Sequence, residues 1–447
     1  MRRYGLSLAV LLLAFALRMI CLAGRPLWYD EAFALLYAAL DPARMVYGTV
    51  TPVADAGAAD VHPLLYYFLL HGWMGWAGRS PLAARFLSVI LGLLTVALLW
   101  RLAAWCFDRR VGLAVGALAA VCPFHVAYSQ ETRMYGLLAL AAVLAAWGLL
   151  RALPGDRPAR AGRWWALYVL GAALTLYAHN LGAVHLLALN LLAVIRRRGR
   201  RCLPTLLLTN LIALALFSPW LVQVLPGQVG FLERGYWLKP PGAAEAVRAA
   251  MLPVLTFYEP APAWLLALGL FTSLMLLTLL MVRVWRTRSR AGWFLLLCWG
   301  PVLVLLLLSL WQPIYLERAL LPAALFYLVA VGWLLVRGGL PRVVRFGLSA
   351  LLLATITGSL SVHYTYVGFP RPPFQEAVAA LEARVEPADR VVHTNKLTFF
   401  PMHVYGPNLP AVFWPTPPAR RRTPWLNPPS KRWVSLPPIP SPPQWVM

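Results

Sequence analysis

Residues 81–105 read PLAARFLSVILGLLTVALLWRLAAW, and this stretch decides the fold class. Between Arg85 and Arg101 it carries no charged side chain. A helix needs roughly 20 such residues to cross the hydrocarbon core of a bilayer. Ten further segments have the same character, so the sequence predicts an all-α polytopic membrane protein with about eleven transmembrane helices. The expected spans are residues 5–23, 81–105, 111–128, 134–151, 164–179, 181–196, 203–225, 263–282, 291–311, 317–336 and 343–362.

The composition supports a membrane protein. Hydrophobic residues make up 60% of the 447 residues and charged residues only 13%, with a mean hydropathy of +0.67. Soluble domains carry roughly 25% charged residues. The net charge of +24 would suggest a nucleic-acid partner in a soluble protein. Arginine clusters beside hydrophobic spans are topology signals, however, so we expect membrane lipid and no nucleic acid as partner.

The basic residues predict the orientation of the chain. With eleven spans, 21 of the 40 Lys and Arg residues fall at the N-terminus and in alternate short connections. The positive-inside rule places these connections in the cytoplasm. The apolar segment 62–78 would scatter them over both sides if it also crossed the membrane. We therefore expect this segment to form a juxtamembrane helix on the outer surface, within a long outer loop at 24–80.

The N-terminal segment resembles a signal peptide, since two arginines precede an apolar run. Arg18 interrupts that run and many spans follow, so we expect an uncleaved first transmembrane helix. Residues 1–362 then form the transmembrane domain.

Residues 363–413 have a different character. Phe374 to Val385 has helical periodicity and a short strand is expected to end at His393, which predicts a small, truncated α/β unit. Residues 414–447 hold 11 Pro and no acid, and predict a disordered tail.

Several polar clusters lie at the expected outer face. They are Trp28-Tyr29-Asp30-Glu31, His62-Pro63-Leu64-Leu65-Tyr66-Tyr67, Tyr128-Ser129-Gln130-Glu131-Thr132-Arg133-Met134-Tyr135, His179-Asn180 and Tyr315-Leu316-Glu317-Arg318-Ala319-Leu320-Leu321-Pro322. Each cluster alone is compatible with interfacial anchoring by Tyr and Trp or with a local ion pair. Carboxylates, arginines and histidines together on one face favour a site for an anionic, lipid-attached substrate.

The order and spacing of these clusters resemble the GT-C type membrane glycosyltransferases that use polyprenyl-phosphate sugars, such as protein O-mannosyltransferases and aminoarabinose transferases. The resemblance covers about residues 1–400, and the string from Tyr128 to Tyr135 is its most specific part. Two positions depart from the group's motifs, because Leu64 replaces a usual second Pro and Ala319 a usual Tyr. The resemblance implies a glycosyltransferase of the bacterial cytoplasmic (inner) membrane, with its active site on the outer, periplasmic face.

The resemblance also implies roles for individual residues. Transfer of a sugar from a lipid phosphate to a hydroxyl of a glycan, glycolipid or protein needs a base opposite the leaving group, and proceeds by single displacement with inversion. Asp30 matches the group's catalytic base. The guanidinium groups of Arg133 and Arg318 suit a phosphate, and His62 is a third candidate for binding it. The expected supporting or acceptor-side residues are Glu31, Glu131, Tyr135, Tyr66, Glu317 and His179.

Two questions stay open at this level. Some members of the group use a divalent metal, and Asp30, Glu31 and His62 are the nearest ligand types, but their spacing is not diagnostic and no cofactor is assigned. The alternative functions are a multi-pass transporter or lipid flippase, and a catalytically inactive relative. The expected span centres are nearly free of charge, which disfavours a transporter.

Overall fold

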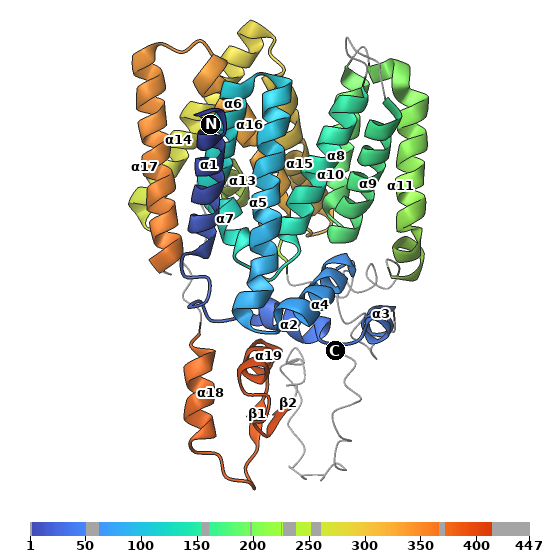
Figure 1. Ribbon diagram of the computed structural model, residues 1–447, viewed down its shortest axis with the longest axis vertical. Helices are drawn as coiled ribbons and strands as arrows, with labels where there is room; N and C mark the ends of the chain where they lie inside the picture. The colour runs from blue at the N-terminus through green and yellow to red at the C-terminus, as the bar shows by residue number, and fades with distance from the viewer. Residues whose placement is uncertain are drawn as a thin grey trace, which may run out of the picture.

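The computed structural model describes residues 2–50, 62–153, 161–196, 199–224, 226, 238–251, 261–365 and 372–413. These residues are mostly helical, and the long helices stand side by side in one bundle (Figure 1). The expected Pro-rich tail at 414–447 lies outside the described residues.

The bundle is built from helices of very different length. By length and hydropathy, seven of the described helices could cross a membrane, or eight if the bent pair α6–α7 counts as one span. The apolar helices α1 and α10 are shorter, so this criterion does not confirm the expected count of eleven. The bundle helices are α1 (Arg2–Met19), α5 (Pro81–Cys106), α6 (Arg109–Val121), α7 (Pro123–Ser129), α8 (Tyr135–Ala152), α9 (Ala161–Ala178), α10 (Gly182–Ile195), α11 (Leu203–Gln223), α14 (Ala263–Thr287), α15 (Ala291–Trp311), α16 (Leu321–Arg337) and α17 (Arg342–Thr365). Two 3₁₀ turns, η1 (Gly199–Cys202) and η2 (Glu317–Leu320), precede α11 and α16.

The segment expected to span at 111–128 is divided into two helices. The chain breaks at Cys122, which is extended with ψ of 116°, and α6 and α7 meet at an angle of 59°. Pro123 explains the break, because proline has no N–H for the helical hydrogen bond and disfavours helical geometry in the residue before it. The bend carries the chain into the buried turn at 130–134.

The centre of the bundle is formed by α8 and α16, which are buried along most of their length. Helices α8 and α9 approach so closely that a Cβ on Gly148 would lie 2.5 Å from the backbone nitrogen of Tyr168. Glycine at this position is therefore required for the packing, as small residues often are where membrane helices meet.

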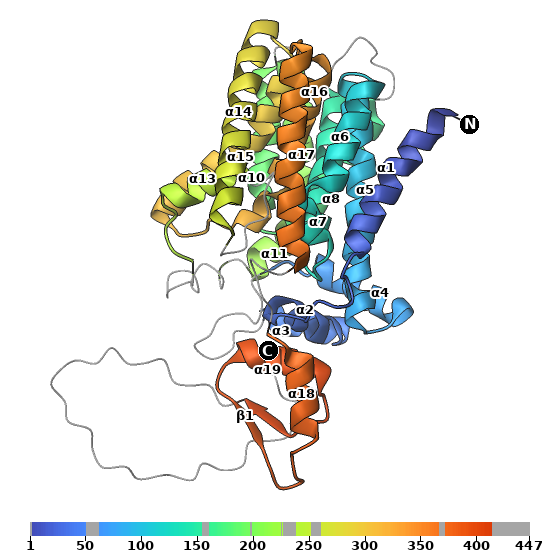
Figure 2. The same ribbon diagram turned by 90° about the vertical axis from the view of Figure 1, so that its left-hand side faces the viewer.

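Three short helices cross one end of the bundle (Figure 2). They are α2 (Tyr29–Ala38), α3 (Pro42–Val50) and α4 (Leu65–Ala77), and α4 corresponds to the helix expected at 62–78. Trp73 of α4 donates a hydrogen bond to the carbonyl of Ala83 at 2.7 Å and so fixes α4 to the start of α5. We refer to this side of the molecule as the α2–α4 end.

The last described residues form a small unit beneath the α2–α4 end. It comprises α18 (Phe374–Glu382), β1 (Val391–His393), α19 (Lys396–Tyr405) and β2 (Ala411–Phe413), with β1 and β2 parallel. The Phe400 ring of α19 stacks on Tyr29 with centroids 5.6 Å apart, and the Tyr405 hydroxyl accepts a hydrogen bond from Leu27 N at 2.9 Å. Helix α19 therefore supports the start of α2.

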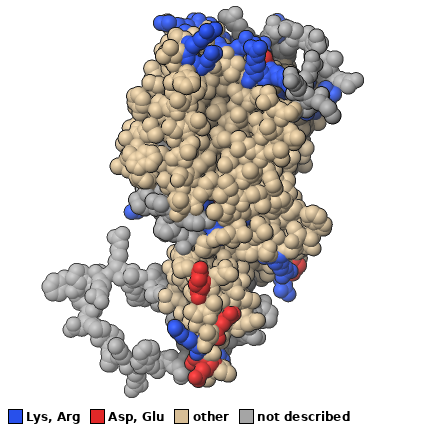
Figure 3. All heavy atoms as spheres, turned by 60° about the vertical axis from the view of Figure 1, so that its left-hand side comes forward, with Lys and Arg blue, Asp and Glu red and all other residues tan. Residues whose placement is uncertain are grey.

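The charged side chains divide between the two ends of the molecule. Figure 3 shows Lys and Arg side chains gathered at the end of the bundle far from the small C-terminal unit, and a surface with few charged side chains between the two. Acidic side chains on this face lie mainly on the small unit.

Candidate active site

Asp30 and Glu31 lie in the first turn of α2. Carboxylates are favourable there because the amide dipoles of a helix leave partial positive charge at its N-terminus. Successive residues on a helix point about 100° apart. The two carboxylates consequently face different partners.

Glu31 is fully buried and bound to Arg85 of α5, which is also fully buried. The Nε and Nη2 groups of Arg85 each donate to the Glu31 carboxylate at 2.8 Å, and the backbone N–H of Thr132 donates to it at 3.1 Å. Arg85 also donates to the carbonyls of Leu22 and Arg25, at 2.8 and 2.7 Å. This Glu31–Arg85 clasp ties α2 to α5 and to the turn at 130–134.

Asp30 points instead toward two other arginines. Arg318 Nη1 donates to Asp30 Oδ2 at 2.7 Å, and Arg133 Nε lies 3.9 Å from the same oxygen. Burial raises the pKa of the Asp30 carboxyl, but the positive charges of Arg133 and Arg318 outweigh burial, so the pKa lies below its ordinary value. Asp30 keeps 15% of its side chain exposed. An ionised carboxylate therefore lies at a partly open site, with a guanidinium group bound to it.

Aromatic rings hold the Arg318 side chain in place. Its guanidinium carbon lies 5.4 Å from the centre of the Trp28 ring and 5.6 Å from that of Tyr135. Such cation–π contacts favour Arg over Lys, because the planar guanidinium stacks on the ring. From α10, His185 Nε2 hydrogen-bonds the carbonyl of Ala319 at 2.8 Å and so fixes the η2 turn that carries Arg318.

Arg133 reaches Asp30 from the buried turn that follows α7. Its Nη1 donates to the Asp30 carbonyl and to the Tyr67 hydroxyl, both at 3.4 Å. The side chain is only 5% exposed. Because α7 begins at the bend at Pro123, this bend brings Arg133 beside Asp30.

Two histidines line the same region. The rings of His62 and His179 lie 5.1 Å apart, and the ring of Tyr135 lies 5.8 Å from that of His179. Electrostatic interactions link His62 to Asp30, and link His179 to both arginines. We refer to the following residues as the Asp30 cluster: Asp30, His62, Arg133, Tyr135, His179 and Arg318.

The other expected site residues lie at its edge or apart from it. Tyr66 is fully buried beneath the site, and burial raises the pKa of its hydroxyl. Glu131 is also buried and interacts electrostatically with Tyr66 and Arg85. Glu317 interacts with Arg248 and Glu245 of α13 (Ala243–Met251), so it is not brought into the Asp30 cluster.

The described residues contain no group of three or more His, Cys, Asp or Glu side chains that could hold a metal ion. The Glu31 carboxylate is occupied by Arg85, and Asp30 is bound to Arg318. The described residues of the site therefore do not fit a divalent metal, and we derive no catalytic step through one.

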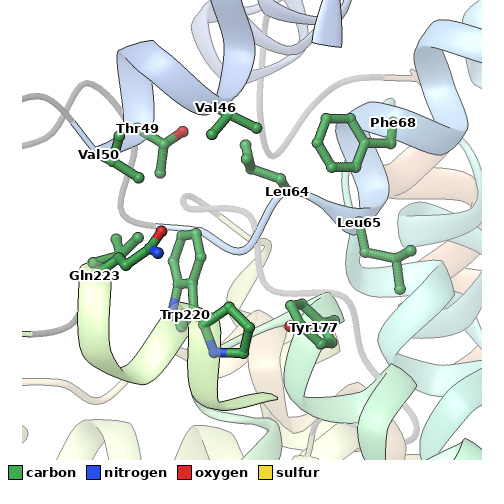
Figure 4. Close-up of a pocket in the computed structure, with 11 residues that line it drawn as sticks. Val46, Thr49, Val50, Leu64, Leu65, Phe68, Tyr177, Trp220 and Gln223 are labelled. Carbon is green, nitrogen blue, oxygen red and sulfur yellow. The ribbon is translucent and has the colours of Figure 1, made fainter. Parts of the chain in front are cut away.

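An apolar cavity of about 370 Å³ lies at the α2–α4 end (Figure 4). Its walls come from α3, α4, α9 and α11, with Leu64 and Leu65 on one side and Tyr177 and Trp220 on the other. Two lining residues, Leu64 and Tyr177, are each two positions from a histidine in the sequence, His62 and His179, whose rings lie 5.1 Å apart.

Comparison with known proteins shows which family model and which solved structures this chain is similar to. Residues 61–222 match the model of the dolichyl-phosphate-mannose-protein mannosyltransferase family. Comparison with curated proteins found no match. The fold is similar to that of ArnT from Cupriavidus metallidurans in the apo state, at 13% identity and a TM-score of 0.63, and bound to undecaprenyl phosphate, at 14% and 0.64. Both matches cover 92% of this chain and 86% of the ArnT chain.

A third similar structure is the Archaeoglobus fulgidus oligosaccharyltransferase tethered with an acceptor peptide, at 13% identity and a TM-score of 0.55. That match covers 90% of this chain and 63% of the archaeal one. The chain therefore has the fold of the GT-C membrane glycosyltransferases. The resemblance to this group that the motifs predict is confirmed.

Three residues that complete this site had no role predicted from the sequence, although Tyr67 belongs to the His62–Tyr67 cluster. They are Arg85, Tyr67 and His185, which bind Glu31, Arg133 and the carbonyl of Ala319. Arg85 carried a usable signal, since an ionisable residue within an apolar span marks a polar contact in the interior of a membrane protein.

Proposed function

We propose that the protein transfers a hexosyl or pentosyl group from a polyprenyl-phosphate donor to a hydroxyl of a cell-envelope glycan, glycolipid or protein. The observation that carries the proposal is the ionised Asp30 carboxylate bound by Arg318 and approached by Arg133 at the α2–α4 end. The similar ArnT structure bound to undecaprenyl phosphate supports a donor of this class.

In the proposed topology, eleven spans place the α2–α4 end on the outer face of a bacterial cytoplasmic membrane. The support is the charge distribution, because the Lys and Arg side chains in Figure 3 gather at the opposite end of the bundle. Positive connections stay in the cytoplasm. The Asp30 cluster then meets donor and acceptor in the periplasm.

The proposed reaction is a single displacement. Asp30 takes the proton of the acceptor hydroxyl. At the same time, the oxygen of that hydroxyl forms a bond to the anomeric carbon of the sugar. The bond from that carbon to the phosphate oxygen breaks, and the polyprenyl phosphate leaves as an anion. No general acid is needed, since the leaving group is a stabilised phosphate. Attack opposite the leaving group inverts the anomeric configuration.

The arginines have two partners in this scheme. Arg318 and Arg133 bind Asp30 in the structure, and a guanidinium fork suits phosphate oxygens equally well. A bound phosphate draws the arginines toward itself and adds negative charge beside Asp30. Both effects raise the pKa of the carboxyl and make it a stronger base. Asp30 is therefore most basic when the donor is bound.

The apolar cavity in Figure 4 is the proposed site of the first isoprene units of the donor. Its lining residues Leu64 and Tyr177 are two positions from His62 and His179 in the sequence, which supports a lipid path toward the phosphate-binding groups. Burial of an apolar chain in such a cavity is favourable because it removes hydrocarbon from water.

The proposal is tested in cells that lack the protein, complemented with wild type, Asp30→Asn or Asp41→Asn. The control residue Asp41 is an exposed carboxylate before α3 that pairs with Arg44 at 3.2 Å. We expect a polyprenyl-phosphate sugar to accumulate without the protein and with Asp30→Asn, but not with wild type or Asp41→Asn. An unchanged lipid-linked sugar pool in every strain would refute the proposed donor, provided the proteins are present in the membrane.

A further inference from the structure

The His179 side chain has one defined tautomer. It follows α9, is 4% exposed, and its Nδ1 accepts a hydrogen bond from the backbone N–H of Leu181 at 3.0 Å. A backbone N–H can only donate, so Nδ1 has no proton. In a neutral ring the proton is therefore on Nε2, on the opposite edge from Leu181.

The surroundings of His179 favour the neutral ring. The ring is buried, and the positive charges of Arg133 and Arg318 reach it. Burial and neighbouring positive charge both disfavour an imidazolium. His179 is therefore a neutral hydrogen-bond donor among cations.

Two uncharged buried donors in this cluster have no hydrogen-bond partner among the residues that the structure describes. They are His179 Nε2 and the Tyr135 hydroxyl, and Tyr135 is 1% exposed. Their rings lie 5.8 Å apart, and Arg318 lies over the Tyr135 ring. Buried polar groups in proteins are normally hydrogen-bonded, so this pair indicates a missing ligand.

The hydrogen-bonding groups of the cluster indicate which kind of ligand it can bind. Arg133, Arg318 and His179 Nε2–H can only donate, and the Tyr135 hydroxyl has a proton to donate. The one carboxylate, Asp30, already accepts from Arg318. A phosphate offers only acceptor oxygens and satisfies such a site, whereas a sugar hydroxyl also needs an acceptor for its own proton.

We propose that His179 Nε2–H and the Tyr135 hydroxyl are neutral donors that bind oxygens of the donor's phosphate. Resting on the proposed function, this assigns two phosphate ligands beyond the arginines. Because neither group carries charge, each adds a hydrogen bond without further repulsion among the cations.

The test compares His179→Phe, His179→Gln and Tyr135→Phe. Phenylalanine keeps a ring beside His62 and Tyr135, whereas glutamine keeps an N–H donor near the position of Nε2. Both His179 variants lose the Nδ1 acceptor for Leu181, so they form a matched pair. The purified full-length proteins are titrated in detergent with undecaprenyl phosphate and with undecaprenol, which lacks the phosphate.

We expect His179→Phe to weaken binding of undecaprenyl phosphate by about ten-fold or more, the typical effect of one hydrogen bond to a charged group. His179→Gln should recover most of this loss, Tyr135→Phe should lose a similar factor, and undecaprenol should bind all four proteins equally.

Three results would overturn the inference. If wild type prefers the phosphate and both Phe variants keep that preference, His179 and Tyr135 do not bind it, and only this inference fails. The same holds if undecaprenol loses as much affinity as the phosphate. If wild type itself does not distinguish the two lipids, the proposed donor is wrong as well.

Discussion

The Glu31–Arg85 clasp should make a large contribution to stability, and Arg85→Met tests it. Both side chains are fully buried, and two 2.8 Å hydrogen bonds join them. Methionine has a similar length but no charge, so it leaves the Glu31 carboxylate buried with only the Thr132 N–H among these partners. Removing one partner of a buried ion pair typically costs about 3–5 kcal/mol.

The size of the loss separates the clasp from ordinary surface pairs. Arg44→Met breaks the exposed pair with Asp41, and should cost about 1 kcal/mol or less. Glu31→Gln should cost less than Arg85→Met, because Arg85 keeps the carbonyls of Leu22 and Arg25. In the double variant neither charge is left unpaired. The free energy of unfolding of the double variant should therefore fall by less than the sum of the two single losses. The difference, which is the coupling energy between Glu31 and Arg85, should be about 1–3 kcal/mol.

The assay is reversible unfolding of the purified proteins in mixed micelles, with loss of helical circular dichroism as the signal. The double-mutant cycle then gives the coupling energy between Glu31 and Arg85. Additive effects, or an Arg85→Met loss no larger than that of Arg44→Met, would refute the conclusion that the clasp fixes α2.

Three further predictions concern the Asp30 cluster and its support. Arg318→Lys keeps the charge but loses the guanidinium fork and its stacking on Trp28, so the donor KM should rise about ten-fold. The control variant Arg337→Lys, at the far end of the bundle, should leave the donor KM unchanged. Equal KM values in both variants would exclude phosphate binding by Arg318. Because the pKa of Asp30 is lowered in the free protein, its ion pairs add stability at pH values above about 4 and lose it as the pH falls through the lowered pKa. Bound phosphate raises that pKa. The fall of kcat at low pH should therefore occur at a higher pH than the fall of kcat/KM. If both parameters fall at the same pH, the donor does not change the pKa of Asp30. Tyr405→Phe removes the hydrogen bond to Leu27 N, so the free energy of unfolding should fall by about 1 kcal/mol and kcat should fall without a change in KM. An unchanged melting temperature and kcat would show that α19 does not support α2.

The sequence was sufficient for features that depend on local patterns. Apolar segments of helical length predicted most of the bundle helices, and the motifs around Asp30, His62, Arg133 and Arg318 predicted residues that lie together. Pro123 carried the information for the bend between α6 and α7, but an apolar run on both sides of it suggested one continuous span.

Contacts between distant segments were not predictable from local patterns. Arg318 is 288 residues from Asp30, and Glu31 pairs with Arg85 of an apolar span 54 residues away. Proximity in sequence suggested that Glu317 and Arg318 act together, yet they have different partners, since Glu317 interacts with α13 and Arg318 binds Asp30. Spacing rules relate residues on one helix, whereas these pairs depend on how the helices pack.

The most direct test of sugar transfer uses the purified protein in liposomes, with an isotope-labelled polyprenyl-phosphate sugar and the glycan, glycolipid or protein acceptor fraction of the membrane. Wild type should move the label to the acceptor and release one polyprenyl phosphate for each sugar transferred. Asp30→Asn should transfer about 10²–10⁴-fold more slowly, the usual effect of removing a general base, with donor binding retained. Transfer by Asp30→Asn at a rate near that of wild type would contradict the account.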